Sequence, residues 1–252
     1  MPGPPDWDAT TYDRVSSPQL DWGLEVLERL DLHGDETVLD AGCGTGRVTS
    51  ELLDRLPRGR VIAVDGSPAM VAKAREALGP RAQVIVADLL ELVLEEPVDL
   101  IFSTATLHWI DDHRRLFTRF HAALRLGGRL EAQCGGRGNV RPVVEALEEL
   151  VDAEPYAEHL VGKGVPWHFA SGEEAESTLR DAGFTDVRCW LEDRDARPSD
   201  LRAFVASSNV CVQLDALPHR LRESFLDDVM ARLSGRASLP YVRLNLSARR
   251  DG

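Results

Sequence analysis

The first half of the chain alternates short apolar runs with segments of helical period. Apolar runs predict five strands, at residues 37–41, 60–65, 83–88, 98–103 and 129–134. Apolar positions three or four residues apart predict helices at 47–56, 68–78 and 113–124. Strands that are apolar on both faces and alternate with helices are typical of a parallel sheet covered on both sides.

The second half of the chain has a different pattern. Helical periods occur at 140–151, after Ser171 in a capping box, and at 221–233. Residues 186–191 have the pattern of a strand, and residues 241–248 alternate apolar and polar. We therefore expect these two strands to pair antiparallel at the sheet edge. The predicted fold class is α/β: a doubly wound, mostly parallel sheet of seven strands with an antiparallel C-terminal strand, plus helical insertions.

Composition narrows the function classes. The 252 residues carry a net charge of −13, which repels phosphate backbones and anionic lipid, so we expect no nucleic-acid and no membrane partner. No apolar run is long enough for a membrane helix, and the first residues do not have the pattern of a signal peptide. The four cysteines form no CxxC pair. We expect a cytoplasmic protein without a metal site, either a monomer or a homodimer.

A glycine-rich loop joins the first predicted strand to the first predicted helix. Asp40 precedes Gly42, Gly44 and Gly46 in the order Asp-Ala-Gly-Cys-Gly-Thr-Gly. Glycines permit a sharp turn and the close approach of a ligand, and the following helix offers free N–H groups. The GxGxG spacing differs from the dinucleotide-binding GxGxxG. The preceding Asp40 suits an ammonium group, contacted directly or through water.

Two further aspartates end the next predicted strands. Asp65 follows the loop at about the ~20-residue distance of a carboxylate that grips two ribose hydroxyls. Asp88 ends the third strand. Because the carboxyl ends of successive parallel strands meet at one crevice, the three acids predict a ligand with an ammonium group, a ribose and an exocyclic amine.

With these motifs the chain resembles the class I S-adenosylmethionine-dependent methyltransferases. The motifs are VLDAGCGTG (38–46), VDGSPAM (64–70), ADL (87–89) and DLIFSTATLHW (99–109), and the match extends over residues 36–134. The resemblance implies a Rossmann-like methyltransferase that uses S-adenosyl-L-methionine and releases S-adenosyl-L-homocysteine. The cofactor-binding residues that it implies are Tyr12, Gln19, Asp40, Ala41, Gly42, Gly44, Gly46, Asp65, Gly66, Met70, Asp88, Leu89 and Thr104.

In that resemblance Asp40 holds the amino group of the cofactor and the glycine loop lies along its methionine part, which Thr104 also lines. Asp65 holds the ribose, while Met70, Asp88 and Leu89 contact the adenine. The ends of the chain are similar to the trans-aconitate methyltransferase group, in YDRVSSPQLDW (12–22), LHWIDD (107–112) and LNLSAR (244–249). This similarity implies a lid from which Tyr12 and Gln19 approach the cofactor, and a small carboxylic acid such as trans-aconitate as methyl acceptor.

We expect a single methyltransferase domain over residues 1–252. Its parts are an N-terminal helical lid (1–32), the cofactor-binding core (36–134), substrate-side helical segments (135–183 and 194–238) and the last strand (239–250).

The methyl acceptor decides what the substrate site needs. A carboxylate is already ionised at neutral pH, whereas a hydroxyl or an amine profits from a general base. His108 is the candidate base, with a hydrogen-bond donor or a packing residue as the alternatives. Arginines would bind a substrate carboxylate through two hydrogen bonds, or else they are solvated loop residues. The candidate substrate-binding residues are Trp22, His108, Trp109, Arg137, Arg141, His168 and Arg243.

Other functions remain as alternatives. One is an O- or N-methyltransferase of secondary metabolism that acts on a small molecule. A remoter alternative is a non-catalytic cofactor-binding protein, which the intact glycine loop and Asp65 disfavour. The GxGxG spacing and Asp88 disfavour an NAD-dependent oxidoreductase. A nucleic-acid methyltransferase would have a basic face and a motif such as Asn-Pro-Pro-Tyr where this chain has Ser103-Thr-Ala-Thr106.

Overall fold

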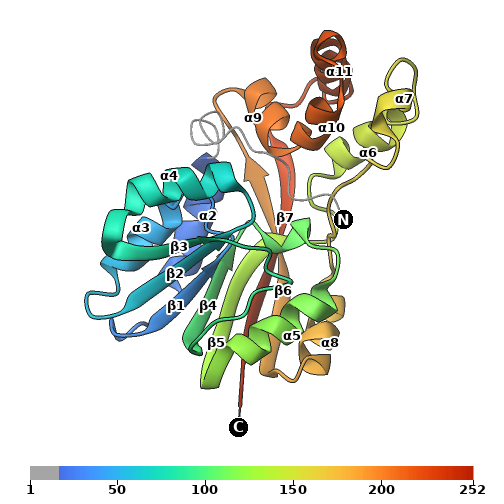
Figure 1. The fold of residues 1–252 in the computed structure, drawn as a ribbon. Helices are drawn as coiled ribbons and strands as arrows, with labels where there is room; N and C mark the ends of the chain where they lie inside the picture. Colours follow the sequence, from blue (N-terminus) through green and yellow to red (C-terminus); the bar gives the residue numbers. More distant parts are fainter. Residues whose placement is uncertain (1–16, 252) are drawn as a thin grey trace.

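A computed structural model describes residues 17–251 and contains one sheet of seven strands. The strands follow the order β3-β2-β1-β4-β5-β7-β6. Their bounds are β1 Thr37–Ala41, β2 Arg60–Asp65, β3 Ala82–Val86, β4 Val98–Thr104, β5 Leu124–Gly135, β6 Thr185–Ala196 and β7 Leu239–Arg249. The first five strands pair in parallel, whereas β7 is antiparallel to both β5 and β6. The predicted fold class is confirmed (Figure 1).

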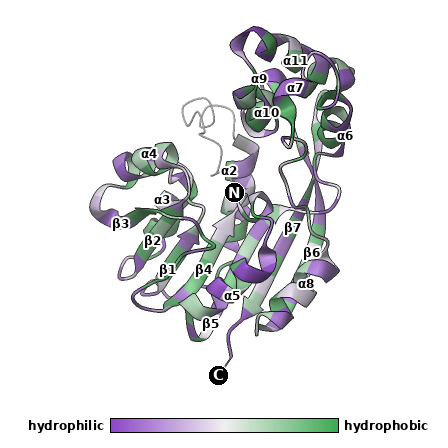
Figure 2. Cartoon of the chain, turned by 45° about the vertical axis from the view of Figure 1, so that its right-hand side comes forward, coloured by the Kyte–Doolittle hydropathy of each residue, from purple (hydrophilic) through white to green (hydrophobic). Residues whose placement is uncertain are grey.

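Helices cover both faces of the sheet. On one face lie α2 (Ser17–Glu28), α3 (Arg47–Asp54) and α4 (Pro68–Leu78), and on the other lie α5 (His113–Ala123) and α8 (Gly172–Asp181). Leu39 and Phe102 point to opposite faces and are fully buried. The strands therefore carry the apolar colour of Figure 2 along most of the sheet, while the helices show polar and apolar sides.

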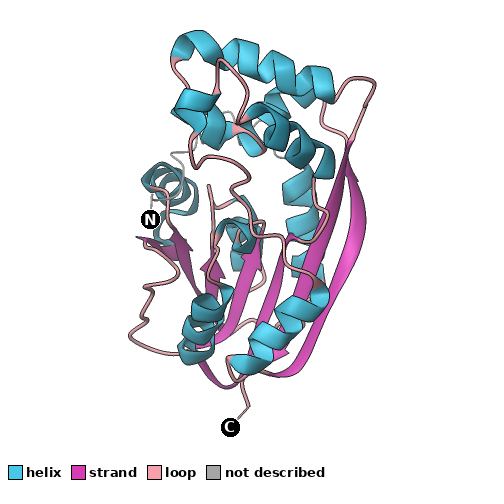
Figure 3. Cartoon of the chain, turned by 90° about the vertical axis from the view of Figure 1, so that its right-hand side faces the viewer, coloured by secondary structure: helices cyan, strands magenta, loops and turns pink. Residues whose placement is uncertain are grey.

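Five helices gather beyond the carboxyl ends of the parallel strands and form a helical cap (Figures 1 and 3). They are α6 (Arg141–Leu150), α7 (Ala157–Leu160), α9 (Leu201–Ser208), α10 (Cys211–Ala216) and α11 (His219–Arg232). The cap shares an apolar core with Trp22 of α2 and Tyr241 of β7. It comes from the two predicted substrate-side segments, although α8 of the first segment packs against the sheet instead.

Local sequence signals set several element ends. The Ser67 hydroxyl accepts a hydrogen bond from Met70 N, with Pro68 at the first position of α4, as predicted. The capping box at Ser171 and Glu174 is also present. The strand predicted at 186–191 is longer, because the ladder to β7 continues through charged residues up to Ala196. No helix within residues 17–251 is both long and apolar enough to cross a membrane.

Candidate functional site

The glycine loop follows β1 at the carboxyl edge of the sheet. Gly42 has a φ of +85° and donates its N–H to Val64 O at 2.7 Å. A Cβ at Gly42 would lie 2.1 Å from Oγ1 of Thr106, so no larger residue fits there. Gly44 has a φ of +54°, and a Cβ there would meet nothing within 4 Å. The backbone at Gly44 is therefore bare and open to a ligand.

A buried carboxyl, Asp40, and a half-buried one, Asp65, lie beside this loop. Asp40 is 2% exposed and accepts a 2.6 Å hydrogen bond from Thr49 Oγ1. Asp65 accepts from the N–H groups of Gly44 at 2.9 Å and Ser67 at 2.8 Å. Burial raises the pKa of Asp40 to about 7, and the nearby Asp65 adds to this rise. Burial also raises the pKa of Asp65. A buried carboxyl whose ionisation is made costly by burial and by a neighbouring carboxylate suits a cationic ligand.

The other predicted cofactor residues lie at the same edge. Asp88 lies two residues beyond the end of β3, is exposed, and accepts from Leu90 N at 2.9 Å; it does not end the strand as predicted. Leu89 and Met70 are buried, Met70 in the first turn of α4. Thr104 ends β4, where α2 passes so closely that a Cβ at Gly23 would lie 3.4 Å from Oγ1 of Thr104.

Ala41 ends β1, and its carbonyl accepts a 2.7 Å hydrogen bond from Ser103 Oγ of β4. Gly66 follows β2, and Gly46 precedes α3 in a left-handed conformation. Tyr12 lies outside the described residues. The structure therefore brings a bare loop and three carboxyls, one buried, one half-buried and one exposed, to one edge of the adjacent strands β1, β2 and β3. This donor and acceptor set fits the ammonium, ribose and adenine of the predicted cofactor.

A pocket with about 390 Å³ of empty space, partly open to solvent, lies next to this loop, below the helical cap. Ala105 belongs to its lining, and the neighbouring Thr106 donates a 3.2 Å hydrogen bond to Gly42 O of the glycine loop. The pocket is lined by Gln19, Ala105, His108, Trp109, Asn139, Val140, Trp167, Phe169, Ser208, Asn209, Tyr241 and Arg243.

The backbone is strained at two points of this lining. Ala105 has a φ of +57° and Val140 has a φ of +42°, in the left-handed region that residues with a Cβ rarely adopt. Such strain costs about 1–3 kcal/mol per residue and is typical of functional sites. The two strained residues lie directly after β4 and directly before α6. Their presence in the lining supports a functional role of the pocket.

Aromatic rings form much of the pocket wall. Trp167 and Phe169 are stacked, with ring centroids 5.4 Å apart and an angle of 20° between the planes. Trp109 meets Trp167 edge-on at 5.7 Å. Tyr241 contributes a further ring from β7. Rings from separate segments thus surround the cavity with flat apolar surface.

The pocket also holds a buried cation, Arg243 of β7. Its side chain is 2% exposed, and its guanidinium carbon lies 5.2 Å from the ring centroid of Trp22. Its Nε donates to Gln133 Oε1 at 3.3 Å. Trp22 itself is buried and packs on Tyr241 at 5.1 Å. Trp22 therefore supports the pocket from behind, and Arg243 lines it.

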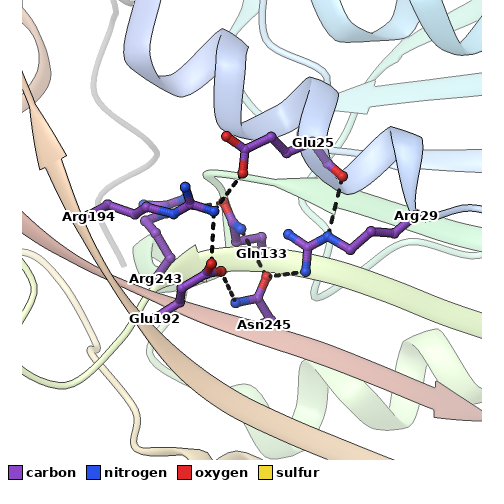
Figure 4. A network of polar contacts seen from close by, with 7 residues as sticks. All are labelled: Glu25, Arg29, Gln133, Glu192, Arg194, Arg243 and Asn245. Carbon is purple, nitrogen blue, oxygen red and sulfur yellow. Dashed lines mark hydrogen bonds and ion pairs between the residues drawn. The ribbon is translucent and has the colours of Figure 1, made fainter.

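A network of polar contacts leads from Arg243 to helix α2 (Figure 4). Gln133 Nε2 and Arg29 Nη1 both donate to Asn245 Oδ1, at 2.9 and 3.0 Å. Asn245 donates in turn to Glu192, whose other oxygen pairs with Arg194 at 2.9 Å. Arg194 also pairs with Glu25 of α2 at 2.6 Å. With Arg243, the residues labelled in Figure 4 include three arginines and two glutamates.

His108 lies in the lining with its ring orientation fixed. Nδ1 accepts a 3.2 Å hydrogen bond from Gly135 N. Since that bond uses the lone pair of Nδ1, the neutral ring carries its proton on Nε2. Burial, with Arg243 and His113 nearby, lowers the pKa of His108 well below its usual value. His108 is thus a neutral ring with an N–H to offer.

Besides Trp22, which packs behind the pocket, three more predicted substrate residues are not among the pocket-lining residues. Arg137 is 68% exposed and pairs with Glu174 at 3.4 Å. Arg141 is 76% exposed and pairs with Glu145 one turn along α6. His168 points to Glu174, with Nε2 3.2 Å from Oε1, although its neighbours in sequence, Trp167 and Phe169, line the pocket. These three side chains have surface partners in this structure and lie outside the pocket lining.

Sequence reasoning missed several residues of the lining. Tyr241 lies two residues before the predicted Arg243 on β7, so both side chains are on the same face of the strand. The sequence could therefore have predicted Tyr241 as a further lining residue. The others that were missed are Ala105, Asn139, Val140, Trp167, Phe169, Ser208 and Asn209. They lie in loops and at helix ends, where no periodic pattern indicates the direction of a side chain.

Comparisons with known proteins agree with this geometry. Residues 38–128 match the family model of a methyltransferase domain. A trans-aconitate 2-methyltransferase of Methylobacterium nodulans is 30% identical over 256 residues, which cover 97% of this chain and 98% of the relative. An uncharacterised methyltransferase of Schizosaccharomyces pombe is 32% identical over 208 residues, 74% of this chain and 79% of the relative.

Solved structures show the same fold. Phosphoethanolamine N-methyltransferase 2 of Haemonchus contortus, in complex with S-adenosyl-L-methionine, has a TM-score of 0.59 at 20% identity, covering 92% of this chain and 53% of that one. The YcgJ protein of Bacillus subtilis has a TM-score of 0.63 at 14% identity, covering 93% of this chain and 99% of that one.

Proposed function

Because this chain belongs to the S-adenosylmethionine-dependent methyltransferases, we propose that it methylates the carboxylate of a small organic acid. The observation that carries the proposal is the buried Arg243 in a pocket directly beside the glycine loop. A guanidinium matches a carboxylate through two parallel hydrogen bonds. Similarity to a trans-aconitate 2-methyltransferase over nearly the whole chain supports an acid as the acceptor.

The residues proposed to hold the cofactor are those at the carboxyl edge of β1, β2 and β3. Asp40 would take the ammonium group and Asp65 the ribose hydroxyls, while the bare backbone at Gly44 lets the ligand approach. Met70 and Leu89 offer apolar surface to the adenine, and Asp88 accepts from its amine. When bound, S-adenosylmethionine supplies an electrophilic methyl group on a sulfonium.

The remaining task of the protein is to position the acid and exclude water. Holding two reactants in line lowers a barrier by about 7–11 kcal/mol. Arg243 fixes the carboxylate, and the network behind it fixes Arg243. The aromatic wall and the helical cap keep water from the reacting oxygen.

A carboxylate acceptor also agrees with the state of His108. Its Nδ1 accepts from Gly135, and its low pKa keeps the ring neutral with the proton on Nε2. The ring therefore donates a hydrogen bond to an anionic oxygen and has no lone pair left to remove a proton. A hydroxyl or amine acceptor would need such a base, so this geometry speaks against that alternative.

A methyl-transfer screen over small acids, phenols and amines, read by mass shift, tests the proposal. We expect methyl esters of acids, and in Arg243→Lys a KM for the acid raised about 10- to 100-fold, since a charge-assisted pair contributes about 1.5–3 kcal/mol. The Kd of S-adenosylhomocysteine should stay within about twofold of wild type. The exposed Arg141→Ala is the matched control, with unchanged KM. Methylation of phenols or amines alone would refute the proposal.

A further inference from the structure

We propose that the acceptor is a monocarboxylic acid with a flat apolar body, and not a tricarboxylic acid. This inference rests on the proposed function, because it concerns the acid that the same pocket receives. It follows from the side chains of residues 17–251 that line the pocket, which include one buried cation, four aromatic rings and neutral polar groups.

The number of cations in the lining limits the number of carboxylates. Among the described residues that line the pocket, Arg243 is the one arginine, and no lysine is present. The histidine of the lining, His108, is held as a neutral donor by Gly135. Arg137 and Arg141 are paired with carboxylates on the surface. A tricarboxylate would leave two carboxylates without a cation in this lining, and a buried charge without a partner is costly.

The aromatic wall suits a planar apolar group instead. Trp167, Phe169 and Trp109 present rings in close mutual contact, and Tyr241 adds another. The faces of aromatic rings carry partial negative charge, so they attract the edge of a second ring and repel a carboxylate. A conjugated or aromatic body attached to the carboxylate therefore fills this space favourably.

Two buried amide oxygens also favour a monocarboxylate. Oδ1 of Asn209 and Oε1 of Gln19 are buried and have no hydrogen-bond partner among the described residues. Asn209 is 4% exposed, and its Nδ2 donates to the Tyr241 hydroxyl at 3.2 Å. An acceptor oxygen repels a carboxylate oxygen and takes an N–H or O–H of a ligand. Extra carboxylates of a substrate would meet acceptors here.

The charge of the whole protein adds to this selection. The chain carries a net charge of −13, and its field opposes the approach of anions more strongly for a trianion than for a monoanion. The net charge of the protein therefore disfavours a trianion during its approach, in addition to the cost that its extra charges meet in the pocket.

Binding of three acids tests the inference without relying on turnover. Calorimetry and tryptophan fluorescence are measured with trans-cinnamate, crotonate and trans-aconitate, on the full chain saturated with S-adenosylhomocysteine. Crotonate keeps the unsaturated carboxylate but replaces the phenyl ring by a methyl group, so it is the matched control for the flat body. We expect trans-cinnamate to bind at least tenfold more tightly than crotonate and at least 100-fold more tightly than trans-aconitate.

Two variants locate the bound ring. Phe169→Leu should weaken trans-cinnamate at least fivefold and leave crotonate within about twofold, while Trp190→Leu on β6, a tryptophan that is 41% exposed outside the pocket, should change neither. Trp167→Leu provides the same test should Phe169→Leu not fold.

The outcomes separate this inference from the proposed function. Tighter binding and esterification of trans-aconitate would overturn the monocarboxylate inference and leave acid methylation standing. Equal affinity for cinnamate and crotonate would likewise overturn it. Methylation of phenols or amines, with no binding of any acid, would overturn both.

Discussion

The backbone N–H of Gly135 donates a 3.2 Å hydrogen bond to Nδ1 of His108. Gly135 is the last residue of β5, and a Cβ there would lie 2.6 Å from Cε1 of Phe169. The glycine thus lets an aromatic ring of the pocket wall and the imidazole approach the same backbone segment. This contact decides which nitrogen of His108 bears the proton, and with it the chemistry that the ring can perform.

His108→Asn should lower kcat by less than about tenfold with a carboxylate acceptor. The substitution removes an orienting N–H but no base, and general base catalysis accounts for about 10²–10⁴-fold where it operates. The pH profile of kcat should also show no new limb between pH 6 and 8. His33→Asn, an exposed histidine at the opposite sheet edge, is the control. A loss of 100-fold or more would instead establish His108 as the base.

Gln133→Leu should raise the KM for the acid about tenfold while kcat changes less. Gln133 Oε1 accepts from Arg243 Nε, and Gln133 Nε2 donates to Asn245, so the amide orients the guanidinium. Loss of a hydrogen bond to a charged group costs about 1.5–3 kcal/mol. Gln133→Glu retains the acceptor but pairs the guanidinium with a carboxylate of the protein, so it should raise the KM for the acid as well.

A purely structural role of Gln133 would give a different result. The melting temperature of Gln133→Leu would fall, but the KM for the acid and its ratio to kcat would stay at the wild-type values. Steady-state kinetics and thermal unfolding on the same preparations distinguish the two cases.

Asp40 should make both stability and cofactor affinity depend on pH. Its pKa is about 7 in the folded protein and about 3.9 in an unfolded chain. Between these values the native state keeps a proton that the unfolded state has lost. The free energy of unfolding therefore falls by up to about 1.4 kcal/mol per pH unit from pH 4 to 7, and it levels off above pH 7.

Cofactor affinity should move in the opposite direction. An ammonium group selects the ionised carboxylate, so S-adenosylhomocysteine should bind about tenfold more weakly for each pH unit below 7. Calorimetry from pH 5.5 to 7.5 measures this, and Asp40→Asn should abolish the slope. Asp193→Asn, at an exposed position of β6, should retain it. If the affinity of Asp40→Asn for S-adenosylhomocysteine still changed with pH in this range, another titrating group would be responsible.

Gly42→Ala and Gly44→Ala should separate folding from cofactor binding. The Cβ at position 42 lies 2.1 Å from Thr106 Oγ1 on a left-handed backbone, so we expect a loss of about 2–5 kcal/mol in urea unfolding. The Cβ at position 44 meets no protein atom within 4 Å and costs about 1 kcal/mol of backbone strain. It should nevertheless weaken S-adenosylhomocysteine at least tenfold. Wild-type affinity in Gly44→Ala would show that the cofactor does not lie along the loop.

The linear sequence determined the fold class and the elements of the cofactor edge. Continuous apolar runs separated by helical periods can only be buried as a sheet covered on both faces, and this gave the predicted seven-strand arrangement. Asp40, Asp65 and the glycine loop were identifiable because they follow directly on strand ends, where the chain direction alone fixes their common edge.

Tertiary structure alone decided the substrate pocket. Its lining comes from α2, the ends of β4 and β5, the loop before α8, the end of α9 and β7, segments that more than 200 residues of chain separate. Arg243 and Arg137 look equally suitable in the sequence, yet one is buried beside aromatic rings and the other is paired on the surface. Burial and pairing depend on contacts between distant segments, and local sequence periodicity carries no information about those contacts.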